Sequence, residues 1–295
     1  FRGLSSTEHA QNIIHEKRTP TTNRRCIFPY ASTDFIAMIP VIETHGLVHY
    51  YGRTQILKGI DLSVPPGQVV GYIGPNGAGK STTIKALIGL LPDFRGEVSV
   101  LGLDLRTDAM EVKRRIGYVP ENAALYDLLT PMEYLDFVGN LYELSSLAVE
   151  KKAFELLRLF GLEQAAHDRM TTFSKGMRQK VLLISGLLHN PDLIFLDEPL
   201  SGLDANAVVL VKQIIRQLAD SGKTVFYSSH IMDVVEKISD RIIIINAGEI
   251  IADGSFAELQ AQRESGSSLE QLFSQLTGAD GQNSTAEEFI YTLNQ

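Results

Sequence analysis

The sequence of 295 residues contains a single cysteine, Cys26. One cysteine excludes an internal disulfide framework and is typical of proteins from reducing compartments. Long hydrophobic runs are missing as well. Apolar runs such as 181–184 and 242–245 are far shorter than the roughly 20 residues that a membrane-spanning helix needs. The sequence therefore predicts no membrane span, and its first residues lack the apolar core of a secretory signal.

Basic residues are not in excess. The chain has 27 Lys and Arg against 35 Asp and Glu, which gives a net charge of −8. Binding to nucleic acid relies on a basic surface, so we expect no nucleic-acid partner. Apolar residues make up 44% of the chain, and a chain of this length and composition is expected to form one or two globular domains with a sizeable core.

The stretch Gly74-Pro-Asn-Gly-Ala-Gly-Lys-Ser81 matches the phosphate-binding P-loop pattern. It follows the apolar run 69–73 and precedes a helical pattern, so a strand runs into a glycine-rich turn and then into a helix. In such a turn several backbone N–H groups converge on one anion, at the positive end of the helix dipole. Lys80 is predicted to contact the β- and γ-phosphates, and Ser81 to offer its hydroxyl to Mg²⁺. The alternative, a glycine-rich turn that only caps a helix, is disfavoured by the complete match.

Two further apolar runs end in polar side chains. Asp197 and Glu198 follow the run 193–196, and His230 follows the strand-like stretch 224–227. Because ligands of open α/β sheets bind at the carboxyl ends of the strands, these groups are expected to meet the P-loop at one edge. We assign Asp197 to Mg²⁺, Glu198 to the proton of an attacking water, and His230 to the γ-phosphate. A lone histidine is more often structural, but its place at a strand end favours chemistry here.

Two weaker features have structural alternatives. Tyr50 and Tyr51 end a short strand, where an exposed ring stacks on adenine or packs on the sheet. Ser174 is predicted to cap the helix that begins at 175 and, with a glycine beside it, to form a second anion site. Most such caps are only structural.

The pattern of strands and helices predicts an α/β fold, a P-loop NTPase with a mainly parallel core sheet. A small antiparallel β subdomain is expected from the strands of 41–64, and a helical subdomain is expected to be inserted at about 122–180. The ATPase domain is predicted to span 38–255, followed by a C-terminal helix and tail over 256–295. Residues 1–37 are polar and aperiodic, and we interpret them as a disordered leader or a non-native extension before Met38.

Taken together, these motifs resemble those of the ATP-binding cassette (ABC) transporter ATPases over residues 41–278. The resemblance implies that 74–82 is the Walker A loop, 193–198 the Walker B strand and 201–204 the D-loop. It also implies that Tyr51 stacks on adenine, that Glu121 occupies the Q-loop position and that His230 is the switch histidine. Residues 173–177 stand at the place of the family's signature motif. The candidate nucleotide-binding residues are Tyr51, Gly74, Asn76, Gly77, Gly79, Lys80, Ser81, Thr82, Glu121, Ser174, Gly176 and Asp204, with Ser81, Asp197 and Glu121 as candidate metal ligands and Glu198, His230 and Lys80 as candidate catalytic residues.

Three residues depart from the family pattern. Glu121 replaces a glutamine, which still permits Mg²⁺ binding but adds negative charge near the γ-phosphate. In the signature, Lys175 replaces a glycine and Met177 a glutamine. Lys175 either points to solvent or adds positive charge to the bound ATP. These variants resemble a branch of exporter cassettes that pair with separate membrane subunits.

The resemblance implies an ATPase that uses ATP and Mg²⁺ to power transport, with export favoured over import. Two cassettes of this family pack head to tail around two ATP molecules, so a second ATP-binding subunit and membrane permease subunits are the expected partners. The protein would then be cytoplasmic and peripheral on the inner face of the cell membrane. The alternative is a soluble cassette ATPase of translation or DNA repair, although this chain has neither a second P-loop nor a long coiled coil. The transported substrate is not encoded in this chain.

Overall fold

The computed structural model describes residues 39–121, 125–261, 268–278 and 292–293. The predicted leader 1–37 and most of the predicted tail after 278 lie outside these residues. In the part of the chain that the structure describes, no helix is long and apolar enough to cross a membrane.

A six-stranded sheet forms the centre of the fold, in the order β10-β9-β3-β8-β7-β6. Its strands β3, β6, β7, β8 and β9 run parallel, and β10 pairs antiparallel with β9 at the edge. The bounds are β3 (Val69–Ile73), β6 (Ile116–Val119), β7 (Leu193–Asp197), β8 (Thr224–Ser228), β9 (Arg241–Asn246) and β10 (Glu249–Gly254). The wholly apolar runs 193–196 and 242–245 are thus central strands, buried on both faces.

A second, antiparallel sheet has the order β2-β1-β4-β5. Its strands are β1 (Ile42–Tyr51), β2 (Thr54–Val64), β4 (Arg95–Val100) and β5 (Leu103–Asp104). The predicted small antiparallel sheet is present, and it gains β4 from beyond the P-loop helix, with Ile42 opposite Val100. None of these strands pairs with the P-loop strand β3.

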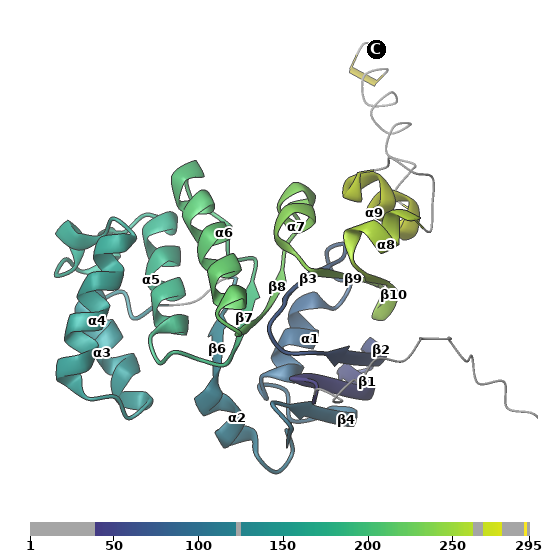
Figure 1. The fold of residues 1–295 in the computed structure, drawn as a ribbon, viewed down its shortest axis with the longest axis horizontal. Coiled ribbons are helices and arrows are strands. Elements are labelled where there is room, and N and C mark those ends of the chain that lie inside the picture. Colours follow the sequence, from purple (N-terminus) through teal and green to yellow (C-terminus); the bar gives the residue numbers. More distant parts are fainter. Residues whose placement is uncertain (1–38, 122–124, 262–267, 279–291, 294–295) are drawn as a thin grey trace, which may run out of the picture. The chain divides into compact units, whose positions relative to one another are not determined.

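Nine α-helices are bounded in the described residues: α1 (Lys80–Leu87), α2 (Ala109–Arg115), α3 (Pro131–Leu141), α4 (Ser146–Leu159), α5 (Lys175–Leu187), α6 (Ala205–Asp220), α7 (Met232–Ile238), α8 (Phe256–Ala261) and α9 (Leu269–Thr277). Two short 3₁₀ helices, Glu163–Ala165 and Met170–Thr172, connect α4 to α5. The helices α5, α6 and α7 lie on one side of the central sheet, whereas α1 and the antiparallel sheet lie on the other (Figure 1).

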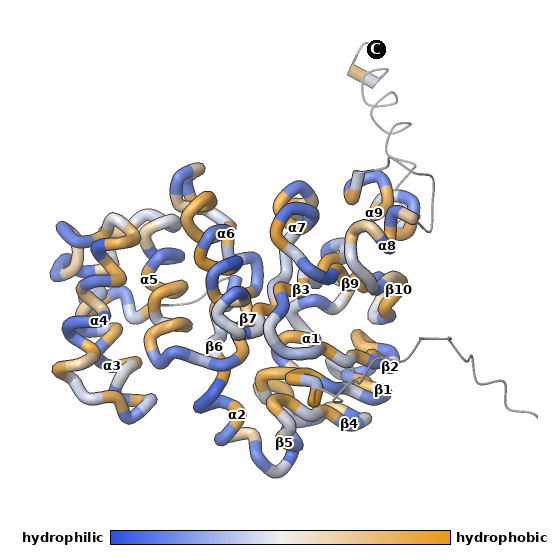
Figure 2. The backbone as a smooth tube through the Cα atoms, viewed as in Figure 1, coloured by the Kyte–Doolittle hydropathy of each residue, from blue (hydrophilic) through white to orange (hydrophobic). Residues whose placement is uncertain are grey.

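Two hydrophobic cores result, one on each face of the central sheet. Strand β3 contributes side chains to both cores. Val69 and Ile73 lie in the core under α5 to α7, and Val70 and Tyr72 lie in the core under α1. Figure 2 shows hydrophobic and hydrophilic stretches alternating along α6. Its buried residues recur every four positions, from Ala207 to Ala219, as a helix with one core-facing side requires.

Candidate functional site

The phosphate-binding loop is held between strand β3 and helix α1. Gly79 caps α1 at φ 112°, a left-handed conformation that favours glycine. The Thr83 hydroxyl, one turn into the helix, donates to the Gly79 carbonyl at 3.0 Å and meets the Tyr72 hydroxyl at 3.1 Å. The Gly248 N–H of the β9–β10 turn donates to the Ala78 carbonyl at 3.0 Å. The loop is therefore fixed by contacts from β3, from its own helix and from a distant hairpin.

The polar groups predicted to converge do lie together. A pocket of about 550 Å³ opens at the carboxyl ends of β3, β6, β7 and β8, which is large enough for a nucleotide. Among the described residues it is lined by Ile56, Asn76, Gly77, Gly79, Lys80, Ser81, Thr82, Glu121, Asp197, Glu198 and His230. The parallel register of these strands explains how residues so distant in the sequence meet at one edge.

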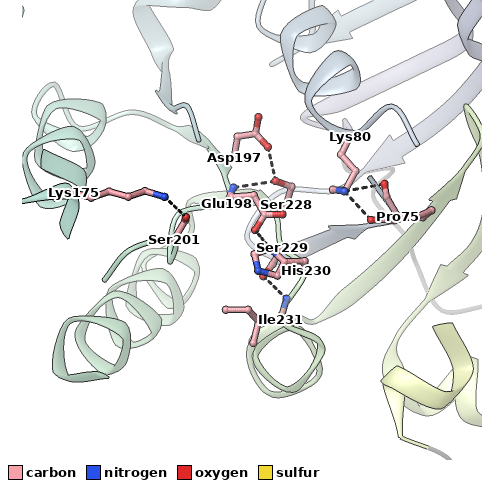
Figure 3. A network of polar contacts seen from close by, with 11 residues as sticks. Pro75, Lys80, Lys175, Asp197, Glu198, Ser201, Ser228, Ser229, His230 and Ile231 are labelled. Carbon is pink, nitrogen blue, oxygen red and sulfur yellow. Dashed lines mark hydrogen bonds and ion pairs between the residues drawn. The ribbon is translucent and has the colours of Figure 1, made fainter. Parts of the chain in front are cut away.

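The two carboxylates at the end of β7 are held by the neighbouring strand. Asp197, only 3% exposed, accepts a hydrogen bond from the Ser228 hydroxyl at 2.6 Å. The same hydroxyl accepts the Glu198 N–H at 3.1 Å. Glu198 has φ 50°, a left-handed conformation that is strained for a residue with a side chain. Ser228 therefore fixes both carboxylate-bearing residues, a role that the sequence did not indicate (Figure 3).

His230 contacts the second of these carboxylates. Its Nδ1 lies 2.7 Å from Oε2 of Glu198. An ionised carboxylate only accepts hydrogen bonds, so Nδ1 carries the proton in this arrangement. The histidine side chain is largely exposed, whereas the Glu198 side chain is largely buried. Ser229, between Ser228 and His230, accepts the Ile231 N–H at 3.1 Å and shapes the turn.

Lys80 is the positive group of the pocket. Its Nζ donates to the carbonyls of Gly74 at 2.7 Å and Pro75 at 3.2 Å. Burial lowers the pKa of Lys80, and the negative charges of Glu198, Asp197 and Glu121 oppose that shift. Burial, reinforced by Asp197, raises the pKa of the nearby Tyr118 to about 12.

Oxygen donors suited to Mg²⁺ line the same pocket. Ser81, Asp197 and Glu121 offer a hydroxyl and two carboxylates. No group of three or more His, Cys, Asp or Glu that could hold a metal by itself occurs in the described residues. Mg²⁺ usually binds through one or two carboxylates together with substrate phosphates, so this donor set fits the ion.

Four predicted nucleotide-binding residues lie elsewhere. Tyr51 is 48% exposed at the end of β1, its ring lies edge-to-face with the His49 ring at 4.8 Å between centroids, and it does not line the pocket. Ser174 caps α5 by accepting the Met177 N–H at 3.2 Å, as predicted. Asp204 caps α6 through the Ala207 N–H at 2.9 Å. Neither these two residues nor Gly176 lines the pocket.

Gly74, the first glycine of the P-loop, contributes its carbonyl to Lys80 rather than lining the pocket. Ile56 of β2 lines it instead, and no pattern in the sequence singled out that residue. The Lys175 side chain is exposed, and its Nζ donates to the Ser201 hydroxyl at 2.9 Å.

Comparison with known proteins agrees with this geometry. The sequence profile of the ABC transporter family matches residues 57–201. The linearmycin resistance ATP-binding protein of Bacillus subtilis is 39% identical over 79% of this chain and 74% of its own. The daunorubicin/doxorubicin resistance ATP-binding protein of Streptomyces peucetius is 40% identical over 75% of this chain and 67% of its own.

Solved structures give the same result. An ATP-binding subunit of an ABC transporter superposes with a TM-score of 0.75 at 34% identity, covering 80% of this chain and 99% of the other. A dimeric ATP-binding cassette in a post-hydrolysis state, bound to ADP and Pi, gives a TM-score of 0.67 at 26% identity, covering 72% of this chain and 98% of the other.

The fold and the pocket define a P-loop ATPase. The chain belongs to the ABC transporter family, as an ATP-binding subunit with ATPase activity. The relatives above are named as resistance ATP-binding proteins, and the similar solved structure is a subunit of an ABC transporter, which disfavours the alternative of a cassette ATPase in translation or DNA repair.

Proposed function

We propose that the pocket hydrolyses Mg–ATP and that two copies of this chain close around two ATP molecules to power export through separate permease subunits. The observation that carries the proposal is the meeting of Lys80, Ser81, Asp197, Glu198 and His230 in one pocket at the carboxyl ends of parallel strands.

Each group has a role that suits its surroundings. The backbone of 74–82 and Lys80 bind the β- and γ-phosphates, with Asn76, Gly77, Gly79 and Thr82 lining the cradle. Ser81, Asp197 and Glu121 would hold Mg²⁺, and the bound ion supplies positive charge that stabilises the phosphates. Ser228 keeps Asp197 in place.

Glu198 accepts the proton of the attacking water, and His230 positions the Glu198 carboxylate. The Nδ1–Oε2 bond at 2.7 Å orients the carboxylate and makes the ring Nδ1 the proton donor. The other ring nitrogen, Nε2, faces the γ-phosphate, whose oxygens only accept, so this contact requires the imidazolium form of His230, in which both ring nitrogens donate. Lys80 stabilises the charge that develops during phosphoryl transfer, so it counts with Glu198 and His230 among the catalytic residues.

The nucleotide-binding residues that lie outside the pocket are assigned to the partner subunit's ATP. Ser174 and Gly176 lie at the exposed N-terminus of α5, a helix end suited to an anion, and Asp204 caps α6 beside it. A homodimer is supported by the dimeric form of the post-hydrolysis cassette described above. Tyr51, exposed at the end of β1, is assigned to the adenine ring.

A permease subunit is proposed to dock on the helical segment beyond Glu121. An exposed aromatic and apolar group lies there, with Tyr126 60% and Leu128 73% exposed and the Tyr126 ring edge-on to Phe137 at 5.7 Å. A cytoplasmic helix of a permease would cover this surface, and the protein would then lie on the inner face of the membrane. The resistance names of the two relatives favour export. Co-purification with a polytopic membrane protein tests this assignment.

The variant Glu198→Gln tests the catalytic assignment. It keeps the shape of the side chain and removes the base, so it should bind ATP without turnover and trap the dimer. ATP hydrolysis and light scattering after gel filtration with ATP measure the two effects. The double variant Glu198→Gln/Lys80→Ala serves as the control and should stay monomeric. Normal hydrolysis by Glu198→Gln would show that Glu198 is not the base.

A further inference from the structure

Helix α5 begins against the segment 199–204, which connects the catalytic strand β7 to helix α6. A Cβ added to Gly176, in the first turn of α5, would lie 2.7 Å from the Gly202 carbonyl oxygen. One turn on, Gln179 is buried and its amide donates to the Pro199 carbonyl at 3.3 Å. Lys180 forms an ion pair with Asp204 at 3.4 Å. Helix α5 therefore contacts this segment repeatedly over its first two turns.

Lys175 adds a further contact at the very start of the helix. Its Nζ donates to the Ser201 hydroxyl at 2.9 Å (Figure 3). Its methylene chain covers Gly202, since a Cβ at that glycine would lie 2.9 Å from Cδ and 3.0 Å from Cγ of Lys175. Gly202 also has φ +76°, so both the close approach of Lys175 and the backbone conformation favour glycine at this position. The side chain thus binds the segment through both its ammonium group and its stem.

A lysine at the first position of a helix needs an explanation. The N-terminal end of the helix dipole is positive, so a cation there is unfavourable. Helix α5 has no acidic residue in its first turn to offset that charge. The hydrogen bond from the ammonium group to Ser201 is charge-assisted and draws the charge away from the helix axis toward the segment 199–204.

The same segment starts at the catalytic carboxylate. The Ser201 N–H donates to the Glu198 carbonyl at 3.1 Å, so the residue that Lys175 holds is bonded directly to the backbone of Glu198. Glu198 has the strained φ of 50°, which persists only where its neighbours hold it. A change in the position of Ser201 therefore acts on the backbone of Glu198.

From this chain of contacts we infer that Lys175 is a positioning residue, which ties the signature helix to Ser201 and so holds Glu198 in its catalytic conformation. The inference rests on the proposed role of Glu198 as the base. It gives Lys175 an effect within its own subunit, on the turnover of the ATP bound there, rather than a contact with the ATP of the partner.

A double-mutant cycle tests whether Lys175 acts through Ser201, and the KM for ATP tests whether Lys175 contacts the ATP of the partner. Lys175→Met keeps the stem over Gly202 and removes the ammonium group, and Ser201→Ala removes the acceptor. Each single variant should lower kcat by about fivefold and leave the KM for ATP within about twofold, the size expected for one lost hydrogen bond. The double variant should fall no further than either single one, because both remove the same bond. Lys151→Met, on the exposed side of α4, is the control for loss of one positive charge and should hydrolyse ATP as the wild type does.

Two results would overturn the inference. Losses that multiply to about 25-fold would show that the two side chains act independently. An unchanged kcat in both single variants, with coupling seen only in urea unfolding, would show a structural contact without effect on catalysis. The proposed function is tested apart from this, by wild-type hydrolysis and by the ATP-dependent dimer of Glu198→Gln, so either proposal can fail alone.

Discussion

At the scale of single residues, Ser228 links the two carboxylates that the chemistry requires. Its hydroxyl donates to Asp197 and accepts from the backbone of Glu198, and all three residues are buried. The register of the sheet makes this possible, since Ser228 pairs with Asp197 across β7 and β8. One hydroxyl thus satisfies a metal-site carboxylate and supports the strained residue beside it.

Ser228→Ala should therefore affect stability and catalysis together. It leaves a buried carboxylate oxygen and a buried N–H without their partner, which costs about 1–3 kcal/mol of unfolding free energy. We expect kcat to fall by about tenfold, about 1.4 kcal/mol of transition-state stabilisation. Urea unfolding and steady-state hydrolysis measure the two effects. Ser229→Ala is the matched control, and an equal loss of kcat there would argue against a specific role for Ser228.

Glu121→Gln should be tolerated. The side chain lines the pocket, and glutamine keeps an oxygen for the metal while removing a negative charge near the phosphates. Hydrolysis should stay within about tenfold of the wild type, or about 1.4 kcal/mol, in a steady-state assay. Complete loss of activity would contradict a role limited to metal contact and coupling.

The sequence was sufficient for the residues that follow strands directly. The P-loop, Asp197 and His230 each follow an apolar run, which predicts that they meet, and Lys80 of the P-loop lines one pocket with Asp197 and His230. The partner of a side chain was harder to predict. The contacts of Ser228 and Lys175 depend on strand register and on the approach of α5 to 199–204, and neither leaves a local pattern in the sequence.

At the scale of elements, local signals predicted the helices and strands well. Helix α6 begins after Asp204, whose side chain accepts the Ala207 N–H, and helix α9 ends before Gly278 at φ 72°, so a polar cap and a glycine stop mark these two helix ends. Which sheet a strand joins was harder to predict from the sequence. Strand β4 pairs with β1 although Ile42 and its partner Val100 lie 58 positions apart in the sequence.

The β9–β10 turn gives a test at this scale. Its residues Ala247 and Gly248 both have positive φ, 47° and 86°, as the tight turn of a hairpin requires. The Gly248 backbone also bridges the phosphate loop and strand β2, donating to Ala78 and accepting the Lys58 N–H at 2.9 Å. A Cβ at Gly248 would collide with the Ile56 carbonyl oxygen.

Gly248→Ala should consequently cost about 3 kcal/mol or more in unfolding free energy, because backbone strain and a backbone collision add. It should also weaken ATP binding, since Gly248 supports Ala78. Gly222→Ala is the matched control: φ is +90° there, but nothing lies within 4 Å of the added Cβ. That variant should lose only the strain, about 1–2 kcal/mol, and bind ATP normally. Equal losses of unfolding free energy in the two variants would show that the contacts of Gly248 with Ala78 and Lys58 add nothing to stability.

At the scale of the molecule, the two cores on either face of the central sheet each enclose a tyrosine. Tyr72 lies in the core under α1 and bonds to Thr83, whereas Tyr227 lies in the core under α5 to α7 and bonds to Ser239 at 2.9 Å. Both rings are fully buried. Burial raises the pKa of each hydroxyl above the ordinary value of 10.0 because an ionised phenol loses its hydration in the core.

These tyrosines should make the fold sensitive to alkaline pH. Their pKa is higher in the folded than in the unfolded state, so their contribution to stability is complete below pH 10.0 and is lost as pH rises above it. We expect the urea midpoint to be steady up to about pH 10 and then to fall steeply. Tyr72→Phe and Tyr227→Phe should each flatten the fall, at the cost of one hydrogen bond that lowers the midpoint at every pH. Burial lowers the pKa of Lys80, so its contribution to the pH dependence of stability has the opposite sign. That contribution is the same in the wild type and in both variants and does not affect the comparison between them. Midpoints that fall equally steeply in the wild type and in both variants would show that other groups control alkaline unfolding.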